Sequence, residues 1–140
     1  MNHVAVIYWS GTGNTEAMAK AVLRGAQKAG ASAELFAVSD FAPEKAAQYD
    51  AFAFGCPAMG GESLEDSEFE PLFESVKPDV AGKKAALFGS YGWGDGEWMR
   101  SWEDNCAESG ITLCAESVIC CEAPDDEALS ACQALGAALA

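Results

Sequence analysis

The chain has few basic residues, one histidine and no long apolar run, and each shortage excludes a class of function. It carries 8 Lys and Arg against 22 Asp and Glu, a formal net charge of −14. Nucleic acid is therefore excluded as a partner, because phosphate backbones attract basic surfaces. No stretch approaches the length of a membrane span, and the N-terminus has no basic segment before a cleavage site, so we expect a cytoplasmic protein with no membrane partner.

The chain is poor in the residue groupings that usually form metal sites and catalytic sites. His3 is the only histidine, and none of the six cysteines forms a Cys-x-x-Cys pair. We therefore expect no zinc or iron–sulfur site, and thiols that stay reduced in the cytoplasm. No Cys–His or Ser–His–Asp grouping can be proposed, so no catalytic residue is assigned.

An apolar run, Val4 to Trp9, leads directly into residues 10–15 and then into a helical pattern. The turn consists of glycines and of residues with polar side chains: Ser10, Gly11, Thr12, Gly13, Asn14 and Thr15. Backbone N–H groups and the positive end of a helix dipole hold phosphate at such a turn. No Lys or Arg occurs before Lys20, and Glu16 stands where the dinucleotide fingerprint needs glycine or alanine. The pattern favours a phosphate held by neutral donors over a plain connecting turn.

Apolar strand patterns and helical patterns alternate along the 140 residues. Strands are expected near residues 3–8, 33–38, 51–55, 83–88 and 112–119, with helices over 15–29, 69–76, 97–107 and from 125 onward. Residues 43–48 form at most a short helix, and Ser67 to Glu70 have the spacing of a capping box. The alternation predicts one α/β domain, residues 1–140, whose parallel sheet has helices on both faces.

Ligands of such sheets lie at the carboxyl ends of the strands. The third strand is followed by Gly55-Cys56-Pro57-Ala58-Met59-Gly60-Gly61-Glu62, and the fourth by Gly89-Ser90-Tyr91-Gly92-Trp93-Gly94. An aromatic residue between glycines is suited to stacking on a flat ligand, which we favour over a lid that covers the sheet edge. Trp98 and Trp102, four residues apart, are expected to be core residues.

These three segments, in this order and spacing, resemble the flavodoxins, most closely the short-chain type of anaerobic bacteria. The resemblance covers the whole chain and implies a doubly wound five-stranded parallel sheet of order 2-1-3-4-5. It implies a noncovalently bound FMN and a carrier of single electrons at low potential that catalyses no turnover of its own.

The resemblance also implies the cofactor contacts. Residues 10–15 hold the phosphate, Trp93 and Met59 cover the two faces of the ring, and the backbone at Gly60-Gly61 approaches N5. Glu62 meets the pyrimidine edge, and the remaining contacts come from Pro57, Ala58, Ser90, Tyr91, Gly92 and Gly94. Whether Cys120-Cys121-Glu122 touches the ring stays open.

The acidic charge predicts the kind of partner, and two other functions were weighed. A monomer this acidic is expected to meet redox proteins that carry basic docking patches. An FMN-dependent NAD(P)H oxidoreductase of the same fold is the alternative. A phosphate-accepting signalling receiver would need acidic residues where the chain has Tyr8-Trp9-Ser10 and Gly55-Cys56.

Overall fold

The computed structural model describes residues 2–60, 63–92 and 94–140. Its strands are β1 (His3–Tyr8), β2 (Ser32–Ala37), β3 (Ala51–Gly55), β4 (Lys84–Tyr91), β5 (Thr112–Leu113) and β6 (Val118–Cys121). They form one sheet of order β2-β1-β3-β4-β5, with β6 also paired to β4, and every pairing is parallel. The predicted α/β class and strand order are confirmed.

The last strand differs from the prediction. A continuous strand over 112–119 is wrong, because residues 114–117 leave the ladder between β5 and β6. Lys84 and Ala85 pair with β5, whereas Phe88 to Tyr91 pair with β6, so both segments lie along the same edge of β4. Cys114 N still donates to Ala85 O at 2.9 Å before the chain turns away. No glycine or proline occurs between Thr112 and Ile119, so the pattern does not reveal the break.

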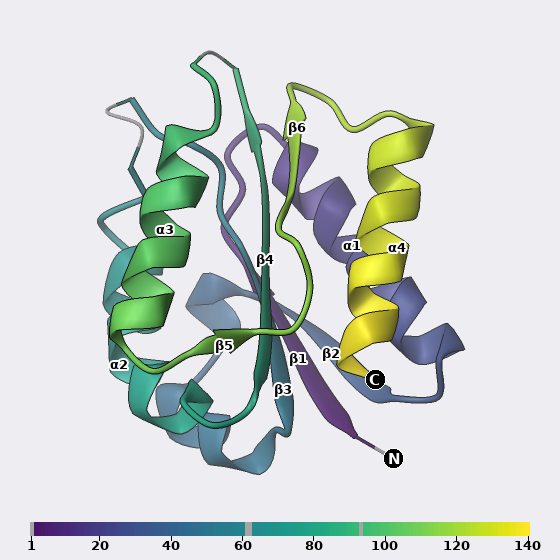
Figure 1. Cartoon of the computed structure of the whole chain (residues 1–140), viewed down its shortest axis with the longest axis vertical. Coiled ribbons are helices and arrows are strands. Elements are labelled where there is room, and N and C mark those ends of the chain that lie inside the picture. The colour runs from purple at the N-terminus through teal and green to yellow at the C-terminus, as the bar shows by residue number, and fades with distance from the viewer. Residues whose placement is uncertain (1, 61–62, 93) are drawn as a thin grey trace.

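Four helices cover the sheet: α1 (Asn14–Lys28), α2 (Phe69–Val80), α3 (Glu97–Glu108) and α4 (Asp126–Leu139). Short 3₁₀ segments, η1 (Val38–Asp40) and η2 (Pro43–Gln48), precede β3. Figure 1 shows α2 and α3 on one side of the sheet and α1 and α4 on the other. In the described part of the chain, no helix has the length and apolar character that crossing a bilayer requires.

Successive strand residues pack against opposite helix layers. In β1, Ala5 and Ile7 belong to the core beneath α2 and α3, whereas Val4 and Val6 belong to the core beneath α1 and α4. All four are completely buried. Because side chains alternate across a strand, a continuous apolar run is what a sheet covered on both faces requires. Trp98 and Trp102 lie in the first core, as predicted.

Two glycines set the distance between α1 and α4. A Cβ atom on Gly25 would lie 2.0 Å from Gln133 O, and one on Gly136 would lie 2.0 Å from Val22 O. No real Cβ approaches a carbonyl oxygen so closely, so the two helices meet backbone to backbone. This close approach leaves these positions to glycine.

The start of α2 is held by a residue outside the expected capping box. Glu68 occupies the N-cap position without a capping side-chain bond. The carboxylate of Glu65 accepts hydrogen bonds instead, from Ser67 N at 2.9 Å, Glu68 N at 2.8 Å and Phe69 N at 2.8 Å, and from the Ser67 hydroxyl. The capping-box prediction is wrong because this buried carboxylate supplies the acceptor from one turn earlier.

Candidate functional site

A cavity of about 360 Å³ opens at the carboxyl ends of β1, β3, β4 and β6. Segments from four places in the sequence line it: Trp9, Gly11, Thr12, Asn14, Pro57, Ala58, Met59, Ser90, Tyr91, Gly92 and Glu122. This is the edge of the sheet where parallel α/β proteins bind ligands. Nine of these eleven residues belong to the three segments singled out in the sequence, and the other two are Trp9 and Glu122.

The turn before α1 keeps its shape through its own side chains. Ser10 Oγ accepts from Gly13 N at 3.0 Å, and Thr12 Oγ1 accepts from Asn14 N at 3.5 Å. Gly13 has φ +95°, a left-handed conformation that glycine adopts without steric cost. Ser10 and Gly13 therefore shape the turn, while Gly11, Thr12 and Asn14 line the cavity. The N-terminus of α1 beside them carries the partial positive charge of the helix dipole.

Thr15 connects this turn to β4. Its side chain is buried, and its Oγ1 lies 3.1 Å from Ser90 Oγ and accepts from Ser90 N at 3.4 Å. Thr15 does not line the cavity, although it was predicted as a site residue, whereas Ser90 does. The hydroxyl pair fixes the distance between the α1 N-terminus and the end of β4.

The second and third segments are joined by their backbones. Ala58 N donates to Ser90 O at 3.0 Å, and Met59 N donates to Ser63 O at 3.0 Å, closing the turn that contains Gly60. Pro57, Ala58 and Met59 form one wall, and Ser90, Tyr91 and Gly92 form another. Gly60 and Gly94 do not line the cavity. Gly61, Glu62 and Trp93 lie outside the described residues.

Two lining residues were not among the site residues predicted from the sequence. Trp9 follows β1 directly, and its N–H donates to Gly55 O at 3.0 Å. A Cβ on Gly11 would lie only 3.2 Å from the indole, so the turn packs closely against the Trp9 ring. The position of Trp9 at the end of β1 was the available signal, because carboxyl ends of strands gather at this edge.

Glu122, whose loop the sequence left open, is the second. Its N–H donates to Tyr91 O at 2.7 Å, and it is the one non-glycine residue in the described part of the chain with positive φ, at +60°. This bond holds the backbone of Glu122 beside Tyr91, where both residues line the cavity. Among the described lining residues Glu122 is the only one with a charged side chain.

The cysteine beneath the cavity is not a nucleophile. Cys56 is fully buried, and burial raises the pKa of its thiol to about 12, although the N–H of Glu65, 3.4 Å from the sulfur, acts in the opposite direction. The thiol is therefore protonated at neutral pH. Among the described residues no cluster of three or more His, Cys, Asp or Glu side chains can hold a metal ion.

Known proteins are similar to this chain in sequence and in fold. The flavodoxin family model matches residues 6–136. The chain belongs to the flavodoxin family. Flavodoxin from Megasphaera elsdenii is 44% identical over 137 residues, which cover 98% of either chain, and flavodoxin from Clostridium beijerinckii is 44% identical over 121 residues, 86% of this chain and 88% of the relative. The resemblance to short-chain flavodoxins of anaerobic bacteria is confirmed.

Solved structures agree with the fold. The solution structure of two-electron reduced Megasphaera elsdenii flavodoxin has a TM-score of 0.88 at 45% identity, with 97% of each chain covered. A flavodoxin from the domain Archaea has a TM-score of 0.86 at 26% identity, covering 98% of this chain and 95% of that one.

FMN is the cofactor of flavodoxins, and the cavity fits it. One end has the hydroxyls and N–H groups of the turn before α1, which suit a phosphate without a balancing cation. The rest has apolar walls from Pro57, Ala58 and Met59 and the aromatic rings of Trp9 and Tyr91, which suit a flat ring system.

Proposed function

We propose that the chain is a low-potential carrier of single electrons that shuttles between redox proteins with FMN bound noncovalently. The observation that supports this is the cavity itself, where a neutral phosphate turn, apolar walls and Glu122 come together. When bound, FMN supplies the redox chemistry. The protein binds the phosphate, encloses the ring and sets the charge around it.

We assign the cofactor contacts to the residues predicted from the sequence, with Trp9 and Glu122 added. Ser10, Gly13 and Thr15 act by shaping the turn and fixing it to Ser90. Gly60, Gly61, Glu62, Trp93 and Gly94 keep the roles that the family resemblance implies for them.

Charge supports the low potential. Reduction adds negative charge to the ring, and the carboxylate of Glu122 at the cavity disfavours it, as does the formal net charge of −14. The same charge favours partners with basic patches by steering their approach. We propose a cytoplasmic monomer consisting of one domain, with no catalytic turnover.

Anaerobic reductive titration of the purified protein tests the proposal. We expect flavin absorption bands in the oxidised protein, two separate one-electron steps, and negligible oxidation of NADH or NADPH. Riboflavin, which lacks the phosphate, should bind the apoprotein far more weakly than FMN, because the N–H groups of the turn lose their acceptor. Rapid oxidation of NADPH would contradict the carrier and favour the oxidoreductase.

A further inference from the structure

The hydrogen-bond ladder between β3 and β4 is interrupted where the cofactor cavity opens. Cys56 N donates to Phe88 O at 3.2 Å, and two residues later Ala58 N donates to Ser90 O at 3.0 Å. In a parallel ladder the bond between these two would run from Ser90 N to Cys56 O. In the described part of the chain both groups instead bond to side chains, which come from opposite faces of the sheet.

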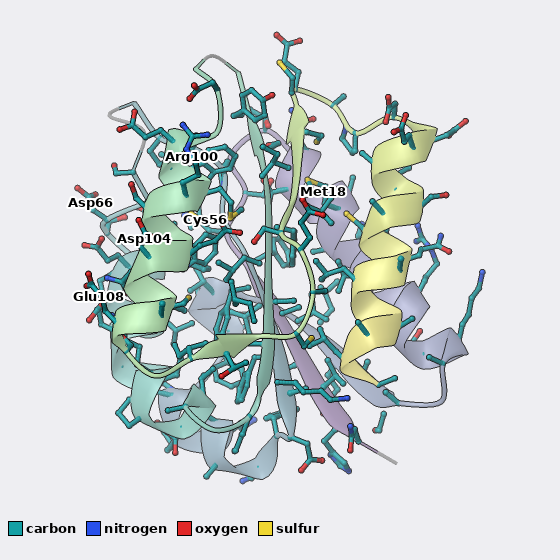
Figure 2. All side chains as sticks on the ribbon, viewed as in Figure 1. Met18, Cys56, Asp66, Arg100, Asp104 and Glu108 are labelled. Carbon is teal, nitrogen blue, oxygen red and sulfur yellow. The ribbon has the colours of Figure 1, made fainter. Side chains whose placement is uncertain are left out.

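The two side chains are those of Trp98 in α3 and Thr15 in α1. Trp98 Nε1 donates to Cys56 O at 3.1 Å, and Thr15 Oγ1 accepts from Ser90 N at 3.4 Å. All four residues are buried. Helices α1 and α3 cover opposite faces of the sheet (Figure 1), and Figure 2 shows Cys56 on the side that α3 covers. The carbonyl of Cys56 and the N–H of Ser90 are therefore held apart, each toward a different helix layer.

Gly89 provides the space for the displaced carbonyl. A Cβ atom on Gly89 would lie 2.2 Å from Cys56 O and 3.2 Å from Cζ2 of Trp98. The carbonyl and the indole thus lie directly over the backbone of β4, in a position that any larger residue would occupy. A glycine inside a strand commonly marks such a close approach of another backbone. The displacement of Cys56 O therefore depends on the way β4 packs against α3.

The interruption separates two walls of the cofactor cavity. Residues 57–59 follow Cys56 directly and form one wall, and residues 90–92 form another. The Trp98 ring packs against Tyr91 of the second wall, with ring centroids 5.5 Å apart. Trp98 is not itself among the described lining residues. It contacts the residue that precedes one wall and a member of the other, so its position sets the distance between them.

We propose that Trp98 is a positioning residue for the cofactor: its indole N–H holds Cys56 O away from Ser90 N and so keeps the two walls apart for the flavin ring. The inference rests on the proposed binding of FMN in this cavity. A buried carbonyl that loses its donor is costly unless it finds another, and Ser90 N is in register to supply one. Closing that bond would draw residues 57–59 toward β4, and FMN would have to break it before binding.

Trp98→Phe tests this, because it removes the N–H and keeps an aromatic ring against Tyr91. The matched control is Trp102→Phe in the same helix. Trp102 is also buried, and its Nε1 has no hydrogen-bond partner among the described residues. Titration of the apoproteins with FMN should give a Kd about tenfold higher for Trp98→Phe and less than about twofold higher for Trp102→Phe. Riboflavin should lose affinity for Trp98→Phe by the same factor, because residues 57–59 flank the ring and not the phosphate.

Hydrogen exchange in the unaltered protein gives a second measurement that does not depend on how a variant folds. If the bond from Trp98 Nε1 supports FMN binding, bound FMN must stabilise the bond by the same factor. In ¹⁵N-labelled protein, FMN should therefore slow exchange of the Trp98 indole proton about tenfold more than that of the Trp102 indole proton. The Trp102 proton reports the general stabilisation that any bound ligand produces.

Three outcomes would overturn the inference. Equal rises in Kd for Trp98→Phe and Trp102→Phe would mean that ring packing alone matters. Equal slowing of the two indole protons would mean that FMN does not favour the Trp98 bond. A loss of affinity for FMN without one for riboflavin would place the effect at the phosphate turn. Flavin bands and two separate one-electron steps in the wild-type protein test the proposed function independently, so its failure is distinguishable from failure of the inference.

Discussion

The hydroxyls of Thr15 and Ser90, 75 positions apart, lie 3.1 Å from each other beneath the cofactor cavity. The contact joins the N-terminus of α1 to the end of β4, the two elements that flank the proposed phosphate and ring positions. Thr15 is 1% exposed and Ser90 is 4% exposed, so no water replaces either partner when the other is lost.

Thr15→Val removes this pair while keeping the shape of the side chain. It should lower the free energy of unfolding by about 1–2 kcal/mol, because the hydroxyl and N–H of Ser90 lose their buried partner. FMN affinity should fall as well. Thr12→Val, at an exposed position of the same turn, should weaken FMN binding without changing stability. Denaturant unfolding of the apoproteins measures stability, and titration with FMN measures affinity. Equal losses of stability in Thr15→Val and Thr12→Val would contradict the separate roles of the two residues.

The lowered pKa of Glu65 predicts how the free energy of unfolding depends on pH. Burial opposes ionisation of its carboxylate, but the hydrogen bonds from Ser67, Phe69 and Glu68 prevail and lower its pKa to about 2 from 4.5. A carboxyl group whose pKa is lower in the folded state than in the unfolded state stabilises the fold. This contribution to the free energy of unfolding is full above the unfolded-state pKa and is lost as the pH falls toward 2.

Glu65→Gln should therefore destabilise the protein by about 2 kcal/mol at pH 7, and the difference should shrink steadily below pH 4.5. Urea denaturation of wild type and variant across this range gives the comparison. Glu68→Gln, an exposed neighbour with the same charge change, serves as the control and should leave stability within about 0.5 kcal/mol. A difference that does not depend on pH would show that the carboxylate charge is unimportant.

Gly136→Ala tests the contact between α1 and α4. The added methyl group would lie 2.0 Å from Val22 O, so the helices must separate, and we expect a loss of about 2–4 kcal/mol. In an isolated helix the same change would be favourable, because alanine has the higher helix propensity. Thermal unfolding measures the effect. Ala137→Ser, at an exposed position one residue later, is the control, and a neutral Gly136→Ala would show that the helices can move apart freely.

Glu122→Gln tests the charge at the cavity. Removing the one charged side chain among the described lining residues should raise the reduction potential of bound FMN by about 20–50 mV, the range for one unit charge several ångströms away in a solvated site. The effect should decrease with added salt, because Glu122 is exposed. Potentiometric titration measures it. Glu116→Gln, exposed and outside the cavity, should have a smaller effect, and identical shifts in both variants would mean that net charge alone sets the potential.

Much of the fold could be predicted from the sequence. Local sequence patterns indicate the buried apolar strands, the helical periodicity and the order of strands and helices along the chain. Each of these depends on residues that are near one another in the sequence. The family resemblance supplied the order 2-1-3-4-5, and three sequence segments located most of the cavity. The patterns gave no warning of the break at 114–117, because no glycine or proline marks it.

The sequence by itself determined the family, the parallel sheet and the turn before α1, because residues close together in the chain encode them. Only the tertiary structure brought Trp9 and Glu122 to the cavity, placed Glu65 at the start of α2, and set Gly136 against Val22. These relationships depend on how strands and helices lie in space. The Tyr91 carbonyl that positions Glu122 is 31 residues away in the chain. The packing that excludes a methyl group at Gly136 involves a helix from the other end of the protein.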